Sequence, residues 1–163
     1  MDENGALARF RENLTAAVRD SIANMASRTR LCGAALCTDD DLRTVYVVAC
    51  STDDCTSADD PDFRFLPVEW ELKPEDDDRL LELSTEMSKL EGFADLFARR
   101  DVLFGVLISA LGSLRVESIV SGEVLLLVTS TDPGKQLTQL AKSAIERLNT
   151  RESHQAFLDA EPW

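Results

Sequence analysis

The apolar positions near the start of the chain repeat at steps of three and four. Between residues 3 and 28 they are Leu7, Phe10, Leu14, Val18, Ile22 and Met25, and charged residues mostly fill the gaps. This spacing places apolar side chains on one side of a helix. The sequence therefore predicts an amphipathic helix over residues 3–28.

Shorter apolar runs follow. Residues 31–37 and 44–51 are bounded by polar clusters, the second is rich in β-branched residues, and the turn between them contains Asp39, Asp40 and Asp41. These features predict a β-hairpin over 31–51. Residues 123–129, Glu-Val-Leu-Leu-Leu-Val-Thr, predict one further, buried strand.

Helical spacing returns in three later stretches, 75–90, 93–111 and 133–148. The acidic residues 75–78 complement the positive end of a helix dipole, and Pro133 is tolerated in a first helical turn. Gly105 weakens the middle helix by about 1 kcal/mol relative to Ala. Residues 51–62 are predicted to form a loop and 150–163 a tail.

These elements predict a single α+β domain over residues 1–163, in which helices pack a small, mainly antiparallel sheet. A chain of 163 residues is long enough for a self-sufficient core, and an apolar content of 44% suits a folded protein. We find no repeat, low-complexity tract or linker that would divide it.

Negative charge is concentrated in one segment. The chain has 30 acidic and 17 basic residues, and residues 38–82 carry −15 + 4 = −11 of the net −13. An acidic surface repels nucleic acid and anionic membranes, so we expect neither as a partner. The N-terminus lacks the features of a signal peptide, and no apolar run approaches the ~20 residues that span a bilayer, so we expect a cytoplasmic protein.

Four cysteines have the spacing C-x4-C-x12-C-x4-C, which resembles a zinc site. Cys32 and Cys37, however, are five positions apart in one predicted strand, about 16 Å along it and on opposite faces, so they cannot share a metal ion. The predicted hairpin places Cys32 opposite Cys50, and these two residues could form a disulfide with each other. Cys55 lies in the predicted loop. In a reducing compartment we expect free, mostly buried thiols, and we predict no metal and no cofactor.

The chain contains no recognisable catalytic motif. Its one histidine, His154, lies in the polar tail, and neither a phosphate-binding glycine loop nor a nucleophile elbow is present. Asp39–Asp41 and Asp76–Asp78 could coordinate a hard cation. Turn chemistry explains the first group and the helix dipole the second, so we predict no catalytic residues and favour a non-enzymatic protein.

Three blocks resemble a known family: Ala35–Val45 (Ala-Leu-Cys-Thr-Asp-Asp-Asp-Leu-Arg-Thr-Val), Phe65–Trp70 (Phe-Leu-Pro-Val-Glu-Trp), and Leu125–Asp132 with Arg147-Leu148-Asn149. In these blocks the chain is similar to the bacterial family named domain of unknown function 4303. Cys37 departs from the aromatic residue expected there, and Val47 and Val48 replace a frequent Gly-Pro. The resemblance implies a small, soluble, intracellular bacterial α+β protein linked to toxin-immunity cassettes, with no catalytic residues to carry over.

Our leading functional hypothesis is a non-enzymatic acidic binding protein, such as an immunity protein that occludes a basic toxin, since opposite charge steers and holds such a partner. Its candidate binding residues are Asp39, Asp40, Asp41, Asp53, Asp54, Asp59, Asp60, Asp62 and, as an apolar anchor, Trp70. Two alternatives stay open: a carboxylate-based or metal-dependent enzyme, and a structural or regulatory subunit whose acidity serves solubility.

Overall fold

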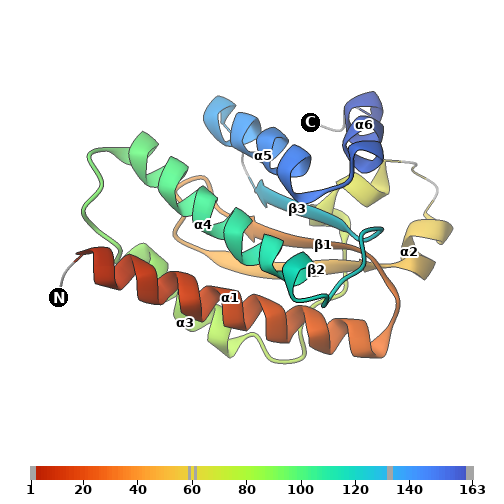
Figure 1. Cartoon of the computed structure of the whole chain (residues 1–163), viewed down its shortest axis with the longest axis horizontal. Coiled ribbons are helices and arrows are strands. Elements are labelled where there is room, and N and C mark those ends of the chain that lie inside the picture. The colour runs from red at the N-terminus through yellow and green to blue at the C-terminus, as the bar shows by residue number, and fades with distance from the viewer. Residues whose placement is uncertain (1–2, 59, 61, 132–133, 161–163) are drawn as a thin grey trace.

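A three-stranded sheet with helices on both faces forms the centre of the molecule (Figure 1). The structure is a computed structural model that describes residues 3–58, 60, 62–131 and 134–160. Its elements in chain order are α1 (Glu3–Arg28), β1 (Leu31–Thr38), β2 (Val45–Ser51), α2 (Thr52–Ser57), the 3-10 helices η1 (Phe63–Phe65) and η2 (Pro67–Glu69), α3 (Asp78–Ser88), α4 (Leu96–Val116), β3 (Leu125–Ser130), α5 (Lys135–Leu148) and α6 (Arg151–Ala160).

The sheet has the strand order β2-β1-β3 and contains both kinds of pairing. β1 and β2 form the predicted antiparallel hairpin. β3 lies parallel to β1, with Ala34 opposite Leu126 and Leu36 opposite Val128. The predicted α+β class is confirmed, but the sheet is mixed rather than mainly antiparallel. The long connection through α3 and α4 allows the parallel pairing, because it carries the chain back across the sheet.

The predicted helices are present, with some different ends. The helix predicted over 3–28 is confirmed at both ends, whereas that over 75–90 is shorter, because the Asp76 carboxylate accepts a hydrogen bond from the Asp78 N–H (3.0 Å) in a turn before α3. The helix predicted over 93–111 is α4, which starts at the N-cap Asp95 and continues unbroken through Gly105 to Val116. None of the described helices combines the length and apolarity needed to cross a membrane.

Two predicted irregular segments contain helix. The 51–62 segment includes the short helix α2, which Ser51 caps by accepting a hydrogen bond from the Asp54 N–H. The tail contains α6, where Phe157 is buried against the ring of Phe65. The helix predicted over 133–148 is α5, and Pro133, which was predicted in its first turn, lies outside the described residues.

The core has two parts, one on each face of the sheet. On one face, alternate strand residues pack against α1, α3 and α4. On the other, a smaller group of buried residues lies under η1, η2 and α6: Ala35, Cys37, Val48, Cys50, Phe65, Trp70, Leu125, Leu127, Ile145 and Phe157. Short elements therefore cover this second face, and most of the cysteines lie there.

Both outer strands have partners beyond the sheet. The Ala49 N–H of β2 donates to the carbonyl of Leu72 at 2.9 Å. On β3, the Asn149 side chain accepts from the Leu126 N–H and donates to the Leu126 carbonyl, each at 2.7 Å. These contacts satisfy backbone groups that would otherwise present an open edge.

Candidate functional site

The acidic hairpin turn is built from its own side chains. The Asp39 carboxylate accepts hydrogen bonds from the Arg43 N–H (2.8 Å) and the Thr44 hydroxyl (2.9 Å). Leu42 adopts a left-handed backbone conformation (φ 52°) while its side chain is fully buried in the core. One of the three consecutive aspartates is thus already used to close the turn.

Two arginines of α4 hold this turn from outside. Arg99 donates to the carbonyls of Asp41 (3.3 Å) and Leu42 (3.1 Å) and also to those of Met87 (2.7 Å) and Leu90 (2.6 Å). Arg100 donates to the carbonyl of Asp40 at 2.8 Å. Burial lowers the pKa of Arg99, and Arg43 lowers it further, while Asp39 and Asp41 act in the opposite direction. The Asp39–Asp41 group therefore has basic residues close to it.

The second group of candidate aspartates lies at the other end of the hairpin (Figure 1). Asp53 and Asp54 occupy the first turn of α2, where the Asp54 carboxylate accepts from the Ser51 hydroxyl at 2.6 Å. The Asp60 carboxylate accepts from the Asp62 N–H at 2.8 Å. Asp59 lies outside the described residues. Strands of this length separate the two groups by about 25 Å, so they do not form one surface patch.

Trp70, the candidate apolar anchor, is part of the core. It is only 3% exposed, and its indole N–H donates to the carbonyl of Phe63 at 3.0 Å. Its ring lies over Gly33, where a Cβ atom would come within 2.6 Å of it. Trp70 thus closes the second face of the sheet, and a partner would need a different apolar contact.

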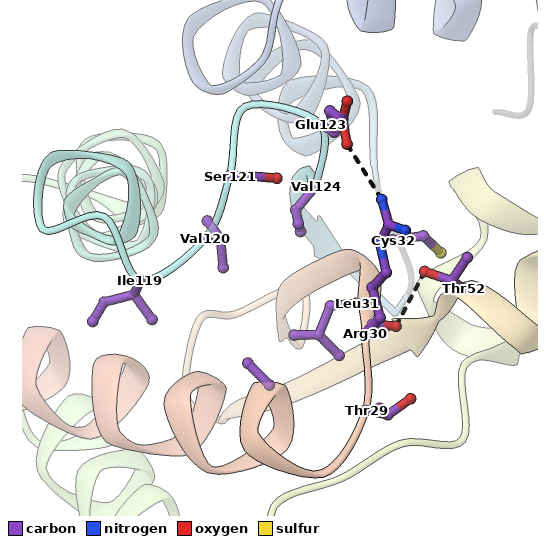
Figure 2. Close-up of a pocket in the computed structure, with 11 residues that line it drawn as sticks. Thr29, Arg30, Leu31, Cys32, Thr52, Ile119, Val120, Ser121, Glu123 and Val124 are labelled. Atoms are coloured by element: carbon purple, nitrogen blue, oxygen red, sulfur yellow. Dashed lines mark hydrogen bonds and ion pairs between the residues drawn. The ribbon is translucent and has the colours of Figure 1, made fainter.

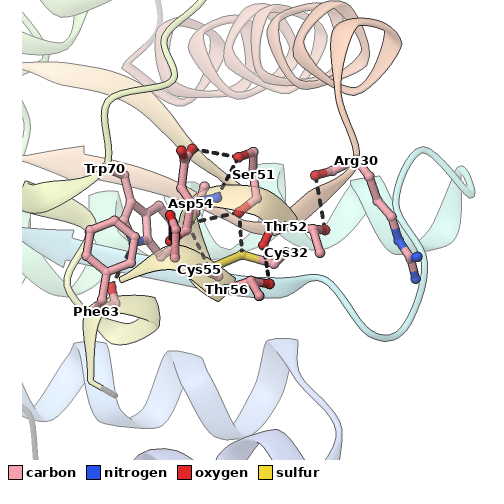
Figure 3. The surroundings of a disulfide bond; sticks show 11 residues. Arg30, Cys32, Ser51, Thr52, Asp54, Cys55, Thr56, Phe63 and Trp70 are labelled. Atoms are coloured by element: carbon pink, nitrogen blue, oxygen red, sulfur yellow. Dashed lines mark hydrogen bonds between the residues drawn. A yellow bond between two sulfur atoms is a disulfide. The ribbon is translucent and has the colours of Figure 1, made fainter. Parts of the chain in front are cut away.

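Three cysteine side chains, those of Cys32, Cys50 and Cys55, meet where β1, β2 and α2 come together, and Figure 3 shows the disulfide in this group. Cys32 and Cys55 form a disulfide, and the Cys50 thiol lies 2.8 Å from the sulfur of Cys55. Burial, followed by the charge of Asp54, raises the pKa of Cys50 to about 12. The pairing differs from the predicted one, because Cys55 returns from α2 to the strands, and the expectation of four free thiols is wrong for Cys32 and Cys55.

A β-bulge changes where Cys32 points. The register shifts between Leu31 and Gly33, so Gly33, and not Cys32, lies opposite Cys50. As a result Cys32 packs against the same core group as Cys37, and their predicted placement on opposite faces is wrong. Cys37 still stays outside the three-sulfur group. Its thiol lies beside Tyr46, and burial raises the pKa of Cys37 to about 12.

Two neighbouring cavities open beside this group. One of about 360 Å³ lies between the end of α1 and the loop before β3, and Cys32, Arg30, Thr52 and Glu123 are among its lining residues (Figure 2). Arg30 and Glu123 form an ion pair across it at 3.6 Å. The second, of about 280 Å³, is lined by both Cys32 and Cys55. The disulfide is therefore close to solvent-accessible space.

One cavity brings carboxylates together, as the enzyme alternative requires. It has a volume of about 270 Å³ and is lined by Asp20, Glu75, Asp76 and Arg79. Asp20 pairs with Arg79 at 3.0 Å, and Glu75 pairs with Arg28 at 3.4 Å. These arginines join α1 to the start of α3, so the arrangement is explained by helix packing.

The chain was also compared with known proteins. A family described as Domain of unknown function (DUF4303) matches residues 12–150. The searches found no significant match among curated proteins and none among solved structures.

Proposed function

The chain belongs to the family described as Domain of unknown function (DUF4303), and because that description names no activity, we propose from the charge distribution that it is a non-enzymatic protein that binds a basic protein partner. The observation that carries the proposal is the exposed acidic segment from α2 to α3. We further propose that the protein is bacterial and cytoplasmic, and that its partner is a toxin. Binding would neutralise the toxin by covering its active surface.

Few of the described carboxylates in residues 38–82 are neutralised by ion pairs within the molecule. Of the described carboxylates in residues 38–82, two lie in ion pairs: Asp41 with Arg43 and Glu75 with Arg28. The cations of the segment are partly used elsewhere, since Arg79 reaches Asp20 of α1 and Arg64 stacks over the ring of Phe65. The remaining negative charge is available to a basic partner, and it would speed the encounter and fix its orientation.

The outer face of α3 offers the combination of charge and apolar surface that interfaces use. Leu81 is 67% exposed, and Asp77, Asp78 and Glu82 are exposed around it. An apolar side chain inside a charged rim is the usual composition of a protein-binding surface. We therefore place the apolar contact of the partner at Leu81, in the role that the sequence suggested for Trp70.

Charge reversal along the acidic segment from α2 to α3 tests the proposal. We would measure by calorimetry how the purified product of the adjacent gene binds to the wild type and to the triple variant Asp53→Lys, Asp77→Lys, Glu82→Lys. We expect the triple variant to weaken binding at least about tenfold, or ~1.4 kcal/mol, through loss of complementary charge. All three residues are exposed, so the fold should tolerate the change.

A matched control separates local from overall charge. The variant Glu146→Lys, Glu152→Lys, Asp159→Lys changes the net charge by the same amount on exposed positions of α5 and α6. It should bind nearly as well as the wild type. Equal weakening by both variants, or no binding of the wild type, would contradict the proposed surface.

A further inference from the structure

We propose that, once the disulfide is reduced, Cys32, Cys50 and Cys55 form a three-thiolate site for zinc. One sulfur atom from each of these residues lies within 4.8 Å of the other two, and among the described residues no other histidine, cysteine or carboxylate joins the group. The site lies apart from the outer face of α3, although Cys55 shares the helix α2 with Asp53, and the metal proposal does not rest on the proposed binding function.

The spacing suits this metal. Zinc–sulfur bonds of about 2.3 Å in a tetrahedral arrangement place ligand sulfurs about 3.8 Å from one another. The Cys50 and Cys55 sulfurs are 2.8 Å apart and all three sulfurs lie within 4.8 Å of one another, so once the Cys32–Cys55 bond is reduced, side-chain rotation can bring them to that spacing. Thiolate is also the ligand type that zinc binds most readily in proteins.

Three different elements supply the ligands. Cys32 lies in the bulge of β1, Cys50 near the end of β2, and Cys55 in α2. Ser51 caps α2, and its carbonyl oxygen lies 3.3 Å from the Cys32 sulfur and 3.5 Å from that of Cys50. A bound ion would therefore join α2 to both strands, as the disulfide now joins it to β1.

Two of the three proposed ligands, Cys32 and Cys55, also line the 280 Å³ cavity. Thr52, Thr56, Glu123 and Ser153 line this cavity together with Cys32 and Cys55. Water or an external oxygen or sulfur ligand can reach the metal there. Three protein ligands with one open position are typical of reactive zinc sites, whereas purely structural sites are closed by four protein ligands.

The disulfide and the metal site exclude one another. A dithiol reductant converts the Cys32–Cys55 bond into two thiols, with uptake of two electrons and two protons and oxidation of the reductant to its own disulfide. Zinc then displaces the three thiol protons as it binds. The oxidised chain retains only Cys50 in the group as a thiol, so the redox state of the cysteines controls whether the metal binds.

Cobalt(II), a spectroscopic substitute for zinc, tests the proposal. We would titrate Co²⁺ into the full chain, reduced with a phosphine and kept free of oxygen, and record the thiolate-to-cobalt absorption. We expect one Co²⁺ per chain, displacement of the band by Zn²⁺, and no band in the oxidised protein. Absence of the band in the reduced wild type would overturn the proposal.

Two single variants distinguish the site from general thiol binding. Cys50→Ser should weaken Co²⁺ binding by at least about tenfold, since even outer-shell partners of metal ligands contribute that much. Cys37→Ser is the matched control, because Cys37 is equally buried but outside the group, and it should bind as the wild type does. Circular dichroism confirms that both variants are folded. Equal affinity of the two folded variants would overturn the assignment of Cys50.

Discussion

At the scale of single residues, Arg99 is the side chain on which the hairpin turn most depends. Its guanidinium donates to four backbone carbonyls, contributed by the turn and by the end of α3 and the residues after it. A lysine ammonium keeps the charge but cannot reproduce this planar set of donors. We predict that Arg99→Lys lowers the free energy of unfolding by about 2 kcal/mol, because several partly buried carbonyls lose their partners at once.

Thermal unfolding provides the measurement for this prediction. A loss of that size lowers Tm by about 4–8 °C in a protein of this length. Arg100→Lys is the comparison, because Arg100 makes a single exposed hydrogen bond to the same turn, and it should change the stability by no more than about 0.5 kcal/mol. Equal Tm values for the two variants would show that the four carbonyls do not depend on Arg99.

The sequence predicted the hairpin turn but not the group formed by Cys32, Cys50 and Cys55. The three aspartates and their position between apolar runs predicted the turn correctly. The apolar pattern does not indicate the bulge at Cys32, because a one-residue register shift depends on tertiary packing; Gly33, next to the bulge, lies under the Trp70 ring. Cys55 lay in a segment without periodicity, so nothing indicated that it returns to the strands.

At the scale of elements, predictability followed the strength of the apolar pattern. α1 has six apolar positions in register and was predicted at both ends, whereas α6 has only Phe157 and Leu158 as large apolar residues and was predicted as a tail. The direction of β3 depends on the path of the chain through α3 and α4, which local pattern does not contain. The α+β class was predicted correctly despite the wrong strand direction, because the class depends on which helices and strands are present and not on how the strands pair.

The junction of α5, α6 and β3 yields a second prediction. Asn149, the residue after the end of α5, bonds both backbone groups of Leu126 and the Ile145 carbonyl. Asn149→Asp keeps the shape but replaces the amide donor with a carboxylate that faces two carbonyls. We predict a loss of about 1–3 kcal/mol, measured by denaturant unfolding. The substitution Gln139→Glu, at an exposed position of α5, adds the same charge and should have little effect, so equal losses would refute the role of Asn149.

At the scale of the whole molecule, the charge is distributed unevenly. Residues 38–82 carry −11, residues 1–37 carry +1 and residues 83–163 carry −3. The six described ion pairs all lie at the surface, and each partner keeps at least 33% of its side chain exposed. Such pairs contribute about 0–1 kcal/mol each, so repulsion among the carboxylates should be the larger electrostatic contribution to stability.

Added salt should therefore stabilise the protein. Raising the ionic strength from about 10 mM to about 150 mM shortens the Debye length from about 30 Å to about 8 Å and screens the repulsion. We predict a higher Tm, by about 2–4 °C per kcal/mol of repulsion removed, measured in sodium chloride by calorimetry. A Tm that falls with salt would mean that the surface ion pairs outweigh the repulsion.

The two charge-reversal variants locate the source of this effect. Each brings the net charge from −13 to −13 + 6 = −7. If the repulsion arises within the α2–α3 segment, the variant of that segment should reduce the dependence of Tm on salt more than the control variant does. The first is Asp53→Lys, Asp77→Lys, Glu82→Lys and the control is Glu146→Lys, Glu152→Lys, Asp159→Lys. Coulomb repulsion falls with distance, and the first three carboxylates lie among the other charges of that segment. The segment that is proposed to attract a basic partner would then also destabilise the free protein. Binding of that partner would therefore raise Tm by more than salt alone does.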